Sequence, residues 1–142
     1  MLLFGHIGIT LGAFFGLAFF IPQLMIVDPA YLIIGSILPD LIDKTLGRVI
    51  FPSTIANGRI IAHTLLFSLT LLLTGLHLYY RTGDTSALSL ALGSIFHLME
   101  DKMWKSPRTL FWPLRGWRFR KNPRHSGIKY LVILFKRSFQ HL

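Results

Sequence analysis

Apolar runs separated by short polar turns divide the chain into four segments, each expected to form a helix. They cover residues 2–27, 31–43, 60–80 and 85–101. A helix needs roughly 20 apolar residues to cross a bilayer, and the first and third runs are that long. The second run is shorter and contains Gly35 and Pro39, so a broken or partly inserted helix fits it best. The pattern predicts an all-α, polytopic membrane helical bundle of about four segments.

The composition favours the same interpretation. Hydrophobic residues make up 52% of the 142 residues, charged residues only 15%, and the mean hydropathy is +0.54. Soluble domains carry about a quarter charged residues, so an integral membrane protein is expected. The chain has no cysteine, which excludes disulfides, thiolate catalysis and cysteine-bound zinc.

Basic residues are concentrated after the fourth segment. Of the 15 Lys and Arg residues behind the net charge of +9, twelve follow Tyr80. The tail also holds all 3 tryptophans, a composition typical of the membrane–water interface. Its apolar stretch 128–135 is too short to span and is expected on the membrane surface. Two regions are therefore predicted: a membrane-embedded helical domain over 1–101 and a basic, aromatic interfacial tail over 102–142.

Loop charge predicts the orientation. Cytoplasmic loops are enriched in Lys and Arg, which places the loop with Lys44, Arg48 and Arg59, and the basic tail, in the cytoplasm. Four crossings then put both termini there. The same topology brings six ionisable side chains to one depth near the cytoplasmic surface: His6, Asp40, Asp43, His63, His97 and Asp101.

Imidazoles and carboxylates gathered at one depth predict a metal site. His97 and Asp101 are four residues apart and share a helix face. Zinc is expected first, with manganese or iron as alternatives, and the donors suffice for one ion or two. The expected ligands are His6, Asp40, His63, His97 and Asp101.

Two further acids are candidate catalytic groups. Asp43 is expected as a ligand, a supporting group or a catalytic carboxylate, and Glu100 as a general base, a supporting group or a surface acid. Two assignments have simpler alternatives. Asp40 could cap a helix that begins at Pro39, and His6 could be a hydrogen-bonded core histidine.

Several of these motifs resemble a known family. The sequence GSILPDLID at 35–43, the early His6 and the spacing of His97 and Asp101 are similar to the predicted membrane-bound metal-dependent hydrolases, which include the LexA-regulated YdjM-like inner-membrane proteins. The run WKSPRTLFWPL at 104–114 resembles the closing segment of that family. The resemblance covers most of the chain up to about Pro113 and implies hydrolysis at a metal centre.

The family's His-Arg-Gly-x-Thr-His-Ser stretch is matched in part. Arg59 and His63 fit the pattern, whereas Gly58 replaces its first His. Ala62 and Thr64 replace the Thr and the final Ser. His63 is therefore the ligand expected from this stretch.

These observations predict a membrane-embedded, metal-dependent hydrolase. Arg59, Lys102 and Lys105 lie beside the predicted site and are expected to bind an anionic substrate group. A cationic site at headgroup depth favours a phosphoester or lipid-linked substrate, although positive-inside topology explains the same cations without a substrate. Membrane lipids are expected partners, and nucleic acid is not.

Two other functions remain open at this point. A non-enzymatic membrane anchor would bind anionic lipid or a partner protein through its basic tail, with any metal purely structural. A small metal-ion transporter would use the intramembrane acids and histidines, with Thr70, Thr74 and His77 as a polar path to the other side.

Overall fold

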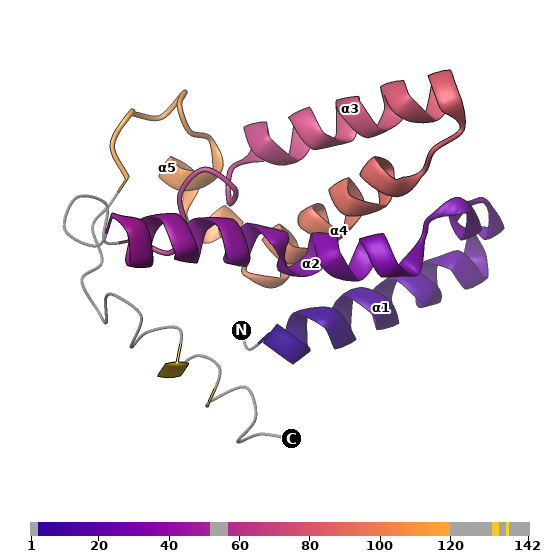
Figure 1. Ribbon diagram of the computed structural model, residues 1–142, viewed down its shortest axis with the longest axis horizontal. Coiled ribbons are helices and arrows are strands. Elements are labelled where there is room, and N and C mark those ends of the chain that lie inside the picture. The colour runs from indigo at the N-terminus through magenta and orange to yellow at the C-terminus, as the bar shows by residue number, and fades with distance from the viewer. Residues whose placement is uncertain (1–2, 52–56, 120–131, 134–135, 137–142) are drawn as a thin grey trace.

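The computed structural model describes residues 3–51, 57–119, 132–133 and 136. Within them the chain is helical and has no strand, which confirms the predicted all-α class. Figure 1 shows its longer helices packed against one another. The elements are α1 (Leu3–Phe20), η1 (Pro22–Ile26), α2 (Pro29–Lys44), η2 (Thr45–Ile50), α3 (Leu65–Thr82), α4 (Ser86–Glu100), η3 (Met103–Lys105) and α5 (Pro107–Leu110).

The predicted polytopic membrane bundle is wrong. No helix in the described part of the chain is long and apolar enough to cross a membrane. The main helices have 18, 16, 18 and 15 residues, and at about 1.5 Å per residue they are shorter than a hydrocarbon core of about 30 Å. The predicted cytoplasmic placement of both termini depended on four crossings and stays a prediction.

The helices are shorter than the apolar runs because the backbone changes direction inside two of those runs. α1 ends at Phe20, and a 3₁₀ helix with Pro22 in its first turn follows. The third run begins at Ile60, but α3 begins only at Leu65, after Thr64 caps it by accepting a hydrogen bond from the Phe67 N–H. Hydropathy alone cannot register such breaks, because the residues on both sides are apolar.

The second segment also differs from the prediction. α2 starts at its N-cap Asp28 and continues through Pro39 to Lys44 as one unbroken helix. Asp40 therefore lies inside the helix and does not cap one that begins at Pro39. The predicted broken segment is wrong, and the helix is longer than the predicted run 31–43.

Two glycines bring α2 and α4 into backbone contact. A Cβ atom at Gly35 would overlap the carbonyl oxygen of Leu90, and one at Gly93 would overlap that of Leu32. Only glycine fits where backbones approach so closely. Asp40 follows Gly35 by five residues and His97 follows Gly93 by four, so this close approach brings both side chains to the same end of the helix pair.

The apolar core lies away from that end, between α1 and α2. Phe14, Ala18, Val27 and Leu32 are buried there in one cluster. The starts of α1 and α3 and the ends of α2 and α4 lie toward the left of Figure 1. The predicted surface segment 128–135 falls largely outside the described residues, and the two-region division stays a prediction.

Candidate metal centre

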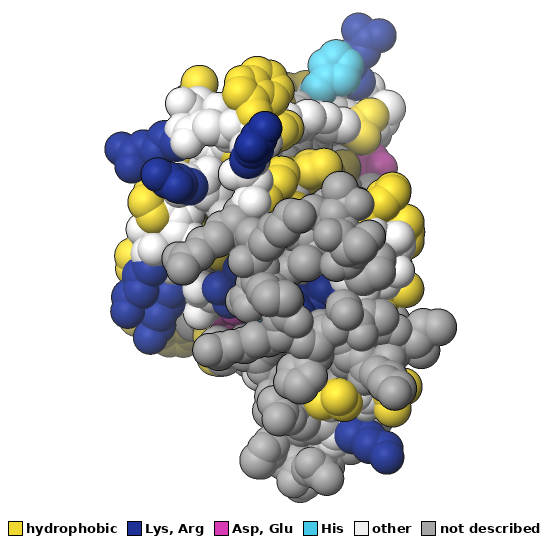
Figure 2. Space-filling model, turned by 90° about the vertical axis from the view of Figure 1, so that its left-hand side faces the viewer, with side chains coloured by type: hydrophobic (Ala, Val, Ile, Leu, Met, Phe, Trp, Pro, Cys, Tyr) yellow, Lys and Arg dark blue, Asp and Glu magenta, His cyan; other side chains and the backbone are white. Residues whose placement is uncertain are grey.

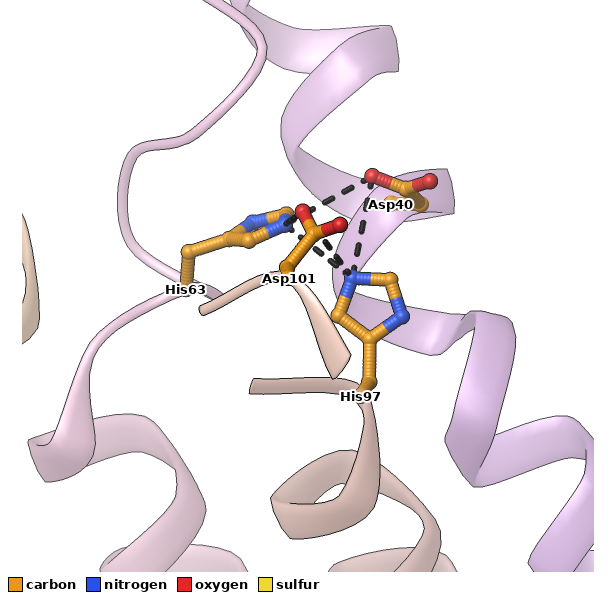
Figure 3. A group of neighbouring side chains, drawn as sticks. All are labelled: Asp40, His63, His97 and Asp101. Atoms are coloured by element: carbon orange, nitrogen blue, oxygen red, sulfur yellow. Dashed lines mark hydrogen bonds and ion pairs between the residues drawn. The ribbon is translucent and has the colours of Figure 1, made fainter. Parts of the chain in front are cut away.

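Four of the predicted ligands meet at one point. Asp40 lies in α2 and His63 in the loop before α3. His97 lies in the last turn of α4, and Asp101 is the C-cap residue of that helix (Figure 3). One donor atom from each lies within 4.8 Å of the others. Histidine and carboxylate donors in this number are a ligand set that zinc, manganese and iron accept.

The spacing of the donor atoms suits a shared ion. The His63 Nε2 and His97 Nε2 atoms are 3.1 Å apart, and Asp40 Oδ1 lies 3.5 and 3.8 Å from them. Asp101 Oδ2 lies 3.6 and 3.9 Å from the same two nitrogens. Donors about 2.0–2.1 Å from a tetrahedral ion are about 3.3 Å apart, so small shifts would bring all four into coordination distance.

Both histidines are oriented through their other ring nitrogen. His97 Nδ1 lies 2.6 Å from the Ser36 carbonyl oxygen, and His63 Nδ1 lies 2.8 Å from Asp43 Oδ2. Both partners are acceptors, so each Nδ1 donates its proton, and in the neutral rings each Nε2 keeps a lone pair. Two such lone pairs 3.1 Å apart repel each other unless a proton or a metal ion lies between them.

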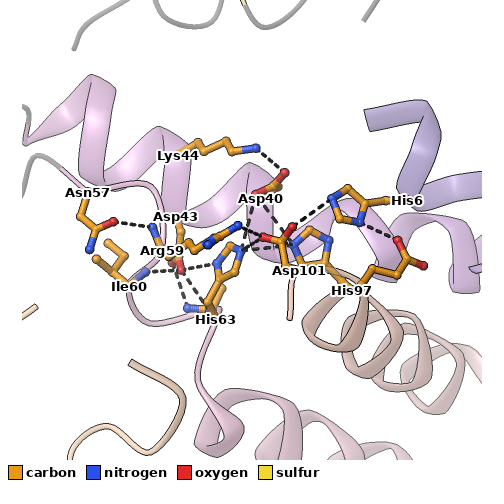
Figure 4. Close-up of polar contacts among 12 residues, drawn as sticks. His6, Asp40, Asp43, Lys44, Asn57, Arg59, Ile60, His63, His97 and Asp101 are labelled. Carbon is orange, nitrogen blue, oxygen red and sulfur yellow. Dashed lines mark hydrogen bonds and ion pairs between the residues drawn. The ribbon is translucent and has the colours of Figure 1, made fainter. Parts of the chain in front are cut away.

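Asp43 holds the loop that carries His63. Its fully buried carboxylate accepts hydrogen bonds from the backbone N–H groups of Ile60, Ala62 and His63, at 2.6, 2.9 and 3.0 Å (Figure 4). With the His63 ring it has four donors. The structure places this predicted catalytic acid behind the histidine, where it positions the ring.

Two cations contact the ligand carboxylates from outside. Lys44 pairs with Asp40 one helical turn away, and the Arg59 guanidinium lies 2.7 Å from Asp101 Oδ2. Burial opposes ionisation of both acids, but hydrogen bonds to His63 and these two cations outweigh it and lower the pKa of each carboxyl. Asp40 and Asp101 are therefore ionised and available as ligands.

The pKa values of His63 and His97 are shifted in opposite directions by their surroundings. Burial lowers the pKa of His63, but its contacts with Asp101, Asp40 and Asp43 outweigh burial and raise the pKa to about 10. Burial and the neighbouring His6 and His63 outweigh the attraction of Asp40 and lower the pKa of His97 to about 4. The cluster therefore favours one positive charge between its carboxylates.

His6 and Glu100 adjoin the four ligands. His6 is fully buried and stacks on His97 with ring centroids 4.2 Å apart. Its Nδ1 lies 2.7 Å from Glu100 Oε2, and Thr10 donates to Glu100 Oε1 at 2.8 Å. Glu100, the other predicted catalytic acid, thus orients His6.

Of the three cations predicted to bind substrate, the structure places one in contact with the cluster. Arg59 contacts the cluster, whereas Lys102 and Lys105 are exposed on the segment directly after α4. Figure 2 shows Lys and Arg side chains spread over the end of the molecule that faces left in Figure 1, with hydrophobic side chains between them. Of the described cations, Lys44 and Arg59 contact the carboxylates of the cluster directly.

The sequence reasoning missed three groups that complete the centre. Lys44 could have been found, because it follows Asp40 by four residues, the spacing of a helical ion pair. Thr10 likewise follows His6 by four residues. The Ser36 carbonyl leaves no signal in the sequence, because a backbone acceptor can belong to any residue.

Comparison with known proteins identifies one family. The family model described as YdjM inner membrane protein matches residues 1–139. No curated protein and no solved structure matches the chain.

Proposed function

The chain belongs to the YdjM inner membrane protein family, and on this premise we propose that it binds a divalent metal ion and uses it to hydrolyse a phosphoester at the membrane surface. The observation that carries the proposal is the convergence of two oriented imidazole Nε2 atoms on two ionised carboxylates. Zinc is the metal that this donor set favours, with manganese or iron as alternatives.

Each residue of the centre has a separate part in this function. Asp40, His63, His97 and Asp101 would hold the ion, and Asp43 and the Ser36 carbonyl fix the histidine rings. A divalent ion in such a site activates water at neutral pH and polarises an ester oxygen. The proposed class of substrate is inferred from the cation Arg59 beside this centre.

Arg59 is the best-placed group to hold an anionic substrate. Its side chain is 44% exposed while one end contacts the ligand Asp101, so it connects the buried centre with the surface. A guanidinium binds two oxygens of a phosphate at once. We therefore infer a phosphate-bearing substrate, such as a phospholipid or another lipid-linked phosphoester.

Arg59→Gln is expected to raise the KM for a phosphodiester about 10-fold or more and to change kcat less, because the lost guanidinium acts in substrate binding. Steady-state hydrolysis of bis-p-nitrophenyl phosphate and of phosphatidylglycerol vesicles, with zinc or manganese supplied, measures both constants. Arg108→Gln, at an exposed position in α5, is the matched control and should match the wild type.

Loss of a ligand provides the decisive comparison for this function. His97→Ala is expected to abolish metal-dependent hydrolysis, because the variant lacks one of the four donors. The proposed reaction is wrong if wild type and His97→Ala hydrolyse these esters equally fast. It is also wrong if the wild type binds the metal but hydrolyses none of them.

A further inference from the structure

His6 has a ring nitrogen for which the described structure gives no hydrogen-bond partner. The side chain is fully buried, and its Nε2 atom has no partner within hydrogen-bonding range. Buried polar atoms in folded proteins are nearly always bonded to protein, water or an ion. This buried nitrogen is therefore a candidate position for a ligand.

The ring is held so that this nitrogen faces Asp101. Glu100 accepts a hydrogen bond from His6 Nδ1, and Thr10 fixes Glu100 in turn, so in the neutral ring the lone pair is on Nε2. That atom lies 3.6 Å from Asp101 Oδ1. The distance is too long for a good hydrogen bond and matches that between two ligands of one ion.

The two oxygens of Asp101 face different histidines. Oδ2 lies 3.6 Å from His63 Nε2 and 3.9 Å from His97 Nε2, within the four-donor group, whereas Oδ1 faces His6 (Figure 4). His6 itself is outside the set of donors that all lie within 4.8 Å of one another. A carboxylate used on both sides in this way is the usual bridge between two ions about 3.5–4 Å apart.

We propose that a second divalent ion binds between His6 Nε2 and Asp101 Oδ1, with Asp101 bridging it to the ion held by Asp40, His63 and His97. This inference rests on the proposed function, because the bridge requires the first ion. The second ion has two protein ligands, so its remaining positions are left for water and for oxygens of the phosphoester. Glu100 and Thr10 are positioning residues for this second ion.

Metal stoichiometry tests the proposal without any measurement of activity. Wild type loaded with manganese and freed of excess metal by gel filtration is expected to hold two ions per chain, and His6→Ala one. Manganese pairs bridged by a carboxylate also give a spin-coupled paramagnetic resonance spectrum, which His6→Ala should replace with that of an isolated ion. His77→Ala, at an exposed position in α3, is the matched control and should keep two ions.

A second variant covers the case in which His6→Ala does not fold. Glu100→Gln keeps the shape of the side chain but weakens the orientation of His6, so the second ion should bind about 10- to 100-fold more weakly, with the first unchanged.

Each other result overturns a definite part of the account. If wild type and His6→Ala each bind one ion, the second metal site does not exist, and the proposed function is unaffected. One ion in wild type and none in His6→Ala makes His6 a ligand of a single ion, which also overturns the inference. No ion in wild type removes the proposed function together with the inference.

Discussion

Asp43→Asn is expected to lower the free energy of unfolding by about 3 kcal/mol or more, because it disrupts a fully buried carboxylate with four donors. Three of these hydrogen bonds end on Oδ2 and one, from the Ala62 N–H, on Oδ1. An asparagine can keep one oxygen but must turn an amide N–H₂ group toward another donor. The loop before α3 then loses its anchor, and metal binding should weaken about 10- to 100-fold, since His63 loses the partner that orients it.

Chemical unfolding of the protein in mild detergent measures the effect on stability. Asp28→Asn is the matched control, because Asp28 caps α2 by accepting from the Ala30 N–H, and asparagine caps helices about as well as aspartate. The control should unfold like the wild type. If Asp43→Asn also unfolds within about 1 kcal/mol of the wild type, Asp43 does not anchor the loop as described.

His63→Ala and His97→Ala are each expected to weaken zinc binding by at least about 100-fold. Each change removes one of four donors from a site in which the remaining groups are already fixed by the fold. Titration of the metal-free protein with zinc against a competing chelator measures the dissociation constants.

Histidine elsewhere in the chain provides the control for these two variants. His77→Ala, in the exposed part of α3, should bind zinc like the wild type. Helix content measured by circular dichroism separates lost ligands from lost folding. Zinc affinity within a few-fold of wild type in both folded ligand variants would place any bound metal elsewhere.

The four ligand candidates could be named from the sequence because ionisable residues are scarce in so apolar a chain, although the membrane topology that was expected to bring them together is wrong. Asp40, His63, His97 and Asp101 all belong to the predicted ligand set, and the structure brings them together. The spacing of His97 and Asp101 is local and needs only helix geometry. The meeting of Asp40 with His97 depends on the glycine contact between α2 and α4, which no single segment shows.

The lengths of the helices could not be predicted in the same way. Ile60 and Ala62 are apolar and fully buried, so hydropathy counts them with the helix that follows. Their backbone N–H groups instead bind Asp43, which lies 17 and 19 residues earlier in the chain. A tertiary hydrogen bond therefore outweighs local pattern here, and the same bond shortens the run that was expected to span a membrane.

The roles of the two outer acids also required the fold. Successive residues of a helix point about 100° apart, so the sequence separates Glu100 from Asp101 but does not identify its partner. The partner is His6, 94 residues earlier, which α1 brings against α4. Asp43 is three residues from Asp40, but it faces the His63 loop while Asp40 faces the ligand group.

X-ray absorption spectroscopy of the zinc-loaded wild type tests the central claim most directly. The account predicts a mixed shell of nitrogen and oxygen ligands at about 2.0–2.2 Å, with the outer scattering of at least two imidazoles. An all-oxygen shell without imidazole scattering, or a protein that retains no zinc after removal of excess metal, would contradict the assignment of Asp40, His63, His97 and Asp101 as a metal centre.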